Sequence, residues 1–169
     1  REIVTPDQWR TIIQRFPYGH SCYIPLLLAY RCGLRLGEAF AIDRKRDIDL
    51  ENGTLAVNQQ VQWLNKHWTF TDPKYDSFRV IKLDRYMLAE LKKVIERQEK
   101  AESFYAEHYT HLYENPQRQL VTKKGEGCRE IHMLSVRENG TYIQPRVMMH
   151  CSRVIHYDLG FENFDYHSL

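Results

Sequence analysis

The chain has 169 residues, of which 43% are hydrophobic and 12% aromatic, so it can bury a core and is not a disordered tail. Its net charge of +2 is only mildly basic, which permits a nucleic-acid partner without requiring one. The longest apolar run, residues 23–30, is too short to span a bilayer, and no charged-then-apolar leader opens the chain. We therefore expect a protein with no membrane partner that is not exported.

Helices are predicted in the first part of the chain. Residues 5–7 (Thr-Pro-Asp) form a helix start, with threonine as N-cap, proline at the first helical position and an acid in the first turn. The apolar face of this helix is predicted to hold Trp9, Ile12, Ile13 and Phe16. A more apolar helix follows over residues 21–31 and ends before Gly33, and a short helix is predicted over residues 36–40.

The period then changes to that of strands. Apolar residues alternate with polar ones over residues 48–61, around Asn52 and Gly53, which are a strong hairpin signal. Residues 68–70 and 78–83 are predicted to be further strands. Together these segments predict one small antiparallel sheet.

The remaining chain is predicted to return mainly to helix. Residues 84–113 carry an apolar stripe and many charges, which is typical of a long surface helix. A second hairpin is predicted over residues 131–143, turning at residues 138–140. Pro145 is predicted to open a last helix that ends near Gly160.

This order of elements predicts an α+β fold, mainly helical with a small antiparallel β-sheet, as a single domain over residues 1–169. No glycine-rich nucleotide-binding phrase is present. The four cysteines, at positions 22, 32, 128 and 151, have no metal-ligand spacing with each other or with the eight histidines. We expect reduced structural cysteines, no metal and no cofactor.

Residues 33–38 (GLRLGE) are the first stretch whose side chains could bind a ligand. Arg35 lies between two glycines at a break between helices, where backbone can approach a ligand. Its planar guanidinium suits a bidentate grip on phosphate, and Glu38, one helical turn later, could orient it. Taken alone, the stretch is better explained as a helix C-cap with a surface ion pair.

Two further stretches are weak by themselves. In residues 71–81, Lys74 is predicted at a hairpin tip, where it could donate a proton to a departing oxygen, and Ser77 and Arg79 could brace phosphates. A solvated turn explains the same residues. The third stretch, near the end of the sequence, contains His167, and a lone histidine there is ordinarily without function.

In this order the three stretches resemble the tyrosine recombinase (phage integrase) family over nearly the whole chain. Family members show G-L-R-x-G-E at the first arginine, and residues 33–38 match every fixed position. They next show T-x-P-K-x-x-S-x-R-x-I on a β-hairpin, which residues 71–81 match. A helix ending in Leu-Gly and an aromatic phrase then precede an H-x-L-R-H box, and residues 159–169 follow that pattern up to its leucine.

The resemblance implies a site-specific recombinase of a mobile genetic element. In such enzymes a tyrosine attacks a DNA phosphate and forms a 3′-phosphotyrosyl link, without a metal or cofactor. It implies that Arg35 and His167 balance phosphate charge, that Lys74 is the general acid and that Glu38 supports Arg35. It also implies double-stranded DNA as partner, tetramers of the full-length protein on DNA, and a bacterial cytoplasmic location.

A basic stretch could add DNA contacts. Residues 117–156 hold seven basic and three acidic residues, a surplus of four. Lys123 and Lys124 are its adjacent lysines, and we expect them to contact phosphates without sequence preference. A solubilising surface is an equally good interpretation.

The sequence departs from the family at its end. It stops one residue before the second arginine expected in the box, so that arginine, the next histidine and the tyrosine would lie beyond Leu169. None of the 11 tyrosines follows the box, and Tyr166 is better interpreted as a core aromatic. We expect a monomeric piece, lacking the family's core-binding domain, that alone neither cleaves nor joins DNA.

Other functions stay open at this point. A DNA-binding relic of an integrase without catalysis is the main alternative. A type IB topoisomerase uses similar chemistry, but its motifs resemble these less. A protein-interaction domain is a further alternative, in which the charged helix over residues 84–113 would be the partner face.

Overall fold

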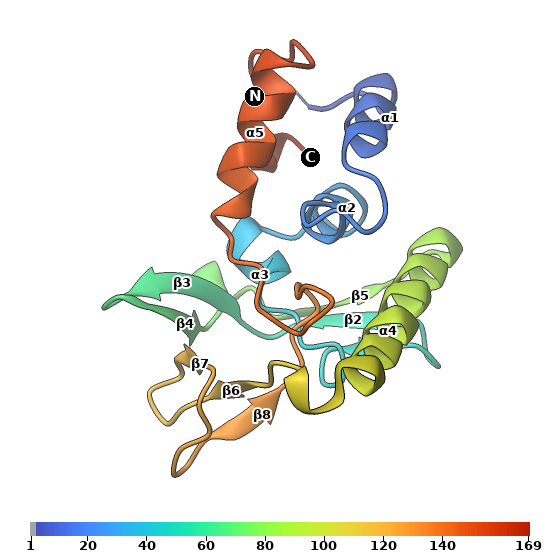
Figure 1. Cartoon of the computed structure of the whole chain (residues 1–169). Helices are drawn as coiled ribbons and strands as arrows, with labels where there is room; N and C mark the ends of the chain where they lie inside the picture. The colour runs from blue at the N-terminus through green and yellow to red at the C-terminus, as the bar shows by residue number, and fades with distance from the viewer. Residues whose placement is uncertain (1–2) are drawn as a thin grey trace.

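The computed structural model describes residues 3–169, and it confirms the helices predicted in the first part of the chain (Figure 1). These helices are α1 (Pro6–Arg15), α2 (Tyr23–Cys32) and α3 (Leu36–Ala39). Thr5 closes a capping box at the start of α1, because its hydroxyl accepts the N–H of Gln8 and the Gln8 side chain accepts the N–H of Thr5. The N terminus of the fold is thus fixed by local sequence.

Antiparallel strands follow, but they form two sheets where one was predicted. The first sheet has the order β1-β2-β5, from β1 (Ile48–Asp49), β2 (Thr54–Val57) and β5 (Arg79–Lys82). The second is a hairpin of β3 (Gln60–Leu64) and β4 (His67–Thr71). The hairpin predicted around Asn52 and Gly53 is confirmed by the pairing of β1 with β2.

The burial pattern agrees with β3 lying outside the first sheet. Leu55 and Val57 of β2 are fully buried, so this strand lies on the core. Along β3 the side chains become exposed after Val61, and the distal half of the hairpin has no core to cover. The strand pattern therefore predicted these strands and the β1–β2 pairing correctly, but not their division into two sheets.

The long helix is shorter than predicted. Helix α4 (Arg85–Tyr105) ends eight residues before the predicted end at residue 113. It ends there because Ala106 takes a φ of 48°, which is incompatible with a right-handed α-helix. A 3-10 turn, η2 (Ala106–His108), follows it. The predicted buried stripe is confirmed by Leu91 and Ile95.

A third antiparallel sheet follows that was not predicted. It has the order β7-β6-β8 and consists of β6 (Leu112–Glu114), β7 (Leu120–Val121) and β8 (Arg129–Ile131). The predicted hairpin over residues 131–143 is wrong in its strands, because Ile131 pairs with Leu112. Its turn is confirmed, since the Gly140 N–H donates to the Arg137 carbonyl and the backbone pairs again at Val136 and Tyr142.

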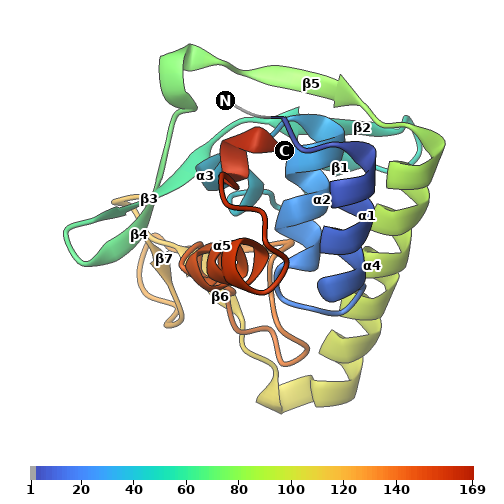
Figure 2. The same cartoon turned by 90° about the horizontal axis from the view of Figure 1, so that it is seen from above.

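The C-terminal segment returns to the N-terminal helices. Helix α5 (Val147–Tyr157) and the 3-10 turn η3 (Tyr166–Ser168) lie beside α2 and near the start of the chain (Figures 1 and 2). The Tyr166 hydroxyl donates to the Pro25 carbonyl at 2.8 Å, which confirms Tyr166 as a core aromatic. The Val4 N–H donates to the Ser168 carbonyl, so the two ends of the described chain are joined.

These elements place helices α1, α2 and α5 on one side of α3 and the third sheet on the other (Figure 1). Helix α4 runs past α2 and is joined to it by the hydrogen bond from the Tyr23 hydroxyl to Glu90 (Figure 2). The short helix α3 thus lies centrally, which matters for the site below. Among residues 3–169, no helix combines the length and apolar character needed to cross a membrane.

Candidate functional site

Arg35 is positioned by the break between α2 and α3. Gly33 takes a φ of 66°, and its N–H donates to the Ala29 carbonyl, which ends α2 in a left-handed cap. Arg35 is the N-cap of α3, and its own N–H donates to Glu38 Oε2 at 2.8 Å. The GLRLGE phrase therefore fixes the backbone of Arg35 with its own glutamate.

Glu38 joins two guanidinium groups. Its side chain is fully buried and receives Arg35 Nη1 on Oε1 at 3.1 Å. Arg79 binds the same carboxylate in bidentate fashion, with Nη1 to Oε1 at 3.1 Å and Nη2 to Oε2 at 2.8 Å. The side chains of Arg35 and Arg79 remain 39% and 31% exposed. We call Arg35, Glu38, Ser77 and Arg79 the arginine cluster.

Within the arginine cluster, Ser77 links Arg35 to the backbone of Lys74. Its Oγ accepts from Arg35 Nη1 at 2.8 Å and donates to the Lys74 carbonyl at 2.9 Å. The guanidinium of Arg79 also donates to the carbonyls of Ser77 and Gly33. Residues from the first two sequence motifs therefore form one hydrogen-bonded unit.

Lys74 does not lie at a hairpin tip, so that prediction is wrong. It begins the 3-10 turn η1 (Lys74–Asp76) on the connection between two sheets, since β4 pairs with β3 while β5 pairs with β2. Tyr75 and Asp76 have φ values of 60° and 50°, which bend the chain sharply. The Lys74 side chain is exposed, with Nζ 5.2 Å from the centre of the Tyr75 ring.

The arginine cluster carries a surplus of positive charge. Burial acts to raise the pKa of Glu38, but hydrogen bonds from Arg79 and Arg35 and the charge of Arg79 outweigh it and hold that pKa below its ordinary value. The carboxylate is therefore ionised at neutral pH and balances only one of the two guanidinium groups. Such a surface is suited to bind an anion.

The C-terminal turn η3 lies close enough to Glu38 for the carboxylate charge to affect a pKa on the turn. The pKa of Tyr166 is raised chiefly by burial and further by the negative charge of Glu38. The neighbouring His167 is exposed, and its N–H donates to Asp165 Oδ1. Among residues 3–169, no hydrogen bond joins the His167 ring to Arg35 or Lys74.

Lys123 and Lys124 lie outside the arginine cluster. Both are exposed on the connection between β7 and β8, in the third sheet (Figure 1). Strand β7 approaches the second sheet, where Thr69 and Gln119 form an isolated bridge. The structure therefore separates the predicted phosphate contacts into two regions.

One buried network was missed in the sequence. Asp43 Oδ2 accepts the N–H of His132, and the Arg44 N–H donates to the His132 carbonyl. The buried guanidinium of Arg44 binds Glu102 Oε2 at 2.9 Å. These partners are 58 or more residues apart, so no local pattern could have indicated the pairing.

A cavity of about 540 Å³ lies away from the arginine cluster. It is bounded by the connection between α1 and α2, by α4 and by residues 135–139. Four tyrosines contribute to its wall, namely Tyr18, Tyr23, Tyr105 and Tyr109. Because none of the motif residues lines it, the candidate site is the exposed surface at Arg35.

Comparison with known proteins supports the fold. No known family profile and no curated protein matches the sequence. The Tn1549 transposon integrase in complex with a circular intermediate DNA is similar over 98% of this chain, with a TM-score of 0.64 and 16% identity. The same integrase with transposon right end DNA gives a TM-score of 0.63 and 17% identity.

These similarities confirm the predicted α+β fold, which the chain shares with part of the Tn1549 integrase. The chain covers 49% and 48% of the two integrase chains, so it spans about half their length.

Proposed function

We propose that the chain is part of a site-specific DNA recombinase of the tyrosine type, which breaks and rejoins strands through a 3′-phosphotyrosyl intermediate. The observation that carries the proposal is the arginine cluster, in which Arg35 and Arg79 are fixed on the buried carboxylate of Glu38. It is formed by the two phrases that match the family's first arginine and its lysine. The fold shared with an integrase solved in complex with DNA supports it.

Arg35 is the group best placed to hold the scissile phosphate. Its Nη1 hydrogens go to Glu38 and Ser77, which leaves Nη2 and Nε to form a planar pair of donors. Such a pair matches two phosphate oxygens, and its charge stabilises the negative charge that develops during phosphoryl transfer. Because Glu38 and Ser77 hold the guanidinium beforehand, little reorganisation is needed when DNA binds.

Arg79 and Ser77 act on the phosphate through Arg35 in this proposal. The four Nη hydrogens of Arg79 go to Glu38 and to the carbonyls of Ser77 and Gly33, so only Nε remains for a ligand. The single hydroxyl hydrogen of Ser77 goes to the Lys74 carbonyl. Both residues are therefore proposed to position Arg35. From the sequence, Ser77 and Arg79 were expected to contact phosphates directly.

Lys74 is the proposed general acid. Its backbone is tied to the arginine cluster through Ser77, while its ammonium group is exposed. It would donate a proton to the departing 5′-oxygen as the tyrosine bonds to phosphorus. His167 is the proposed first histidine of the box, and the proposal is supported by its place on η3 next to Tyr166, whose pKa the charge of Glu38 helps to raise.

The 169 residues alone are proposed to be a monomer that does not cleave or join DNA. The proposed reaction needs a tyrosine after the box, and none of the 11 tyrosines follows His167. DNA binding needs no nucleophile and is therefore testable with this chain.

Binding of the chain to duplex DNA is expected to be salt-dependent. In the double variant Lys123→Gln/Lys124→Gln, the slope of log affinity against log salt should fall by roughly 2, since each phosphate contact contributes about 0.9. Fluorescence anisotropy on a duplex of arbitrary sequence, from about 50 to 200 mM NaCl, measures this slope.

The matched control is Lys92→Gln/Lys100→Gln, which removes two exposed lysines from α4. Its slope should equal that of the wild type. If both double variants change the slope equally, binding is a general charge effect, and Lys123 and Lys124 are not phosphate contacts.

A further inference from the structure

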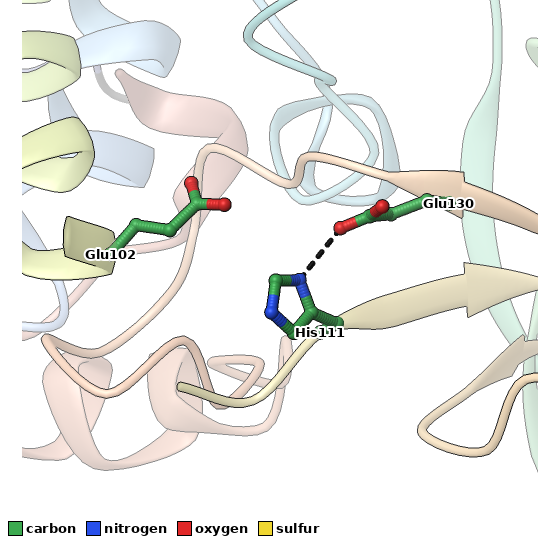
Figure 3. Close-up of side chains that lie close together, drawn as sticks. All are labelled: Glu102, His111 and Glu130. Carbon is green, nitrogen blue, oxygen red and sulfur yellow. Dashed lines mark hydrogen bonds and ion pairs between the residues drawn. The ribbon is translucent and has the colours of Figure 1, made fainter. Parts of the chain in front are cut away.

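Glu102, His111 and Glu130 come together at the end of α4 beside the third sheet (Figure 3). Glu102 lies in the last turns of α4, His111 directly precedes β6, and Glu130 lies on β8. Each offers one ligand atom, and these atoms all lie within 4.8 Å of one another. Figure 3 shows the Glu102 carboxylate pointing from α4 toward the other two side chains.

His132 extends this group. The pairing of Leu112 with Ile131 places the next residues, His111 and His132, opposite each other across β6 and β8. His132 Nε2 lies 3.8 Å from Glu130 Oε1, and His111 Nδ1 lies 2.7 Å from the same oxygen. Two imidazoles thus flank one carboxylate on the same face of the sheet.

We propose that these side chains bind a divalent cation, and Zn²⁺ is the ion that their chemistry favours. Imidazole nitrogen and carboxylate oxygen are ordinary Zn²⁺ ligands, with bonds of about 2.0–2.2 Å, which put tetrahedral ligand atoms roughly 3.4 Å apart. The three ligand atoms lie within 4.8 Å of one another, so metal binding requires the Glu102 carboxylate to move inward and the 2.7 Å hydrogen bond between His111 and Glu130 to open. Glu102, His111 and Glu130 provide three ligands, and His132 is the proposed fourth.

Arg44 supports the geometry and also opposes the charge of a cation. Its Nη2 bonds to Glu102 Oε2, an outer partner of the kind that orients metal-ligating carboxylates. Its positive charge, with that of nearby Lys45, offsets part of the attraction of Glu102 and Glu130 for a cation. Glu102, His111 and Glu130 give three ligands, and His132 as the proposed fourth would complete a tetrahedral set for Zn²⁺.

The structural consequence is a link between α4 and the third sheet. In the described chain, the ion pair between Arg44 and Glu102 links α4 to the segment before β1. A metal ion would instead link α4 directly to β8 and to the residue before β6. This would fix the sheet that carries Lys123 and Lys124 relative to the rest of the fold. The site is independent of the proposed recombinase chemistry, so either proposal can fail without the other.

Calorimetric titration of the chelator-treated chain with ZnCl₂ tests the site. We expect one Zn²⁺ bound per chain and a rise in melting temperature on binding. The variants His111→Ala and Glu130→Gln should each weaken Zn²⁺ binding by about tenfold or more, since even outer-sphere changes cost about 10–100-fold. His132→Ala should weaken it as well, because it removes the proposed fourth ligand.

The matched control is Glu107→Gln/His108→Ala, which alters an exposed histidine–glutamate pair just before the site. It should bind Zn²⁺ like the wild type. His111 and Glu130 are partly exposed, and a far-ultraviolet circular dichroism spectrum without metal verifies that their variants fold. Absence of Zn²⁺ uptake by the wild type overturns the proposal, as does uptake that His111→Ala and Glu130→Gln leave unchanged.

Discussion

Replacing Glu38 by glutamine is expected to lower the free energy of unfolding by about 3 kcal/mol, at the lower end of the range for a broken buried ion pair. The variant keeps the shape of the side chain but leaves Arg35 and Arg79 side by side without a counter-charge. The lower end applies because both arginines keep some contact with water. Urea denaturation at neutral pH measures the change, and exposed Glu99 on α4 provides a control, since Glu99→Gln should stay within about 0.5 kcal/mol.

The same residue gives the stability a defined pH dependence. The pKa of Glu38 is lower in the folded chain than its ordinary value of 4.5, so folding is favoured by its ionised form. That contribution is complete above pH 4.5 and is lost as the pH falls through the lower folded pKa. Below pH 4.5 the wild type should therefore lose stability more steeply than Glu38→Gln. Parallel curves for the two proteins would contradict the role assigned to Glu38.

Replacing Gly140 by alanine is expected to cost about 3 kcal/mol or more. Gly140 has a φ of 85°, which strains an L side chain by about 1–2 kcal/mol. A Cβ there would also lie 2.4 Å from the Thr110 carbonyl oxygen and 2.7 Å from the Tyr109 ring, and overpacking typically adds about 1–3 kcal/mol. Urea denaturation again measures the change.

Gly160 is the matched control for this substitution. Its φ is 75°, but no atom lies within 4 Å of an added Cβ, so Gly160→Ala should cost only the backbone strain. A cost for Gly140→Ala no greater than that for Gly160→Ala would show that residues 138–140 do not pack on Thr110 as described.

The N-terminal helices were predictable because their signals are local. The capping box at Thr5 and the left-handed cap at Gly33 each lie within one turn of the helix end that they define. The link between Arg35 and Glu38 was predictable for the same reason, since the two residues lie one helical turn apart.

The third sheet and the partners of Arg79 were not predictable in this way. Strands β6, β7 and β8 have only two or three residues each, too few for a period to be visible, and Ala106 ends α4 without a glycine to mark the turn. Arg79 binds Glu38 across 41 residues, so its sequence motif indicated phosphate binding but not this ion pair, on which the proposed positioning role rests. Long-range packing decides both features.

The gene product that contains these residues provides the most direct test of the proposed function. It would be incubated with nicked duplexes that together tile the DNA flanking its gene, and protein–DNA adducts that survive detergent would be measured. We expect an adduct with a 3′-phosphotyrosyl link and a free 5′-hydroxyl, reduced by about 10²–10³-fold in Arg35→Ala, as for loss of a fixed transition-state donor. No adduct on any duplex, or an adduct that Arg35→Ala leaves unchanged, would contradict the proposal and favour a DNA-binding protein without catalysis.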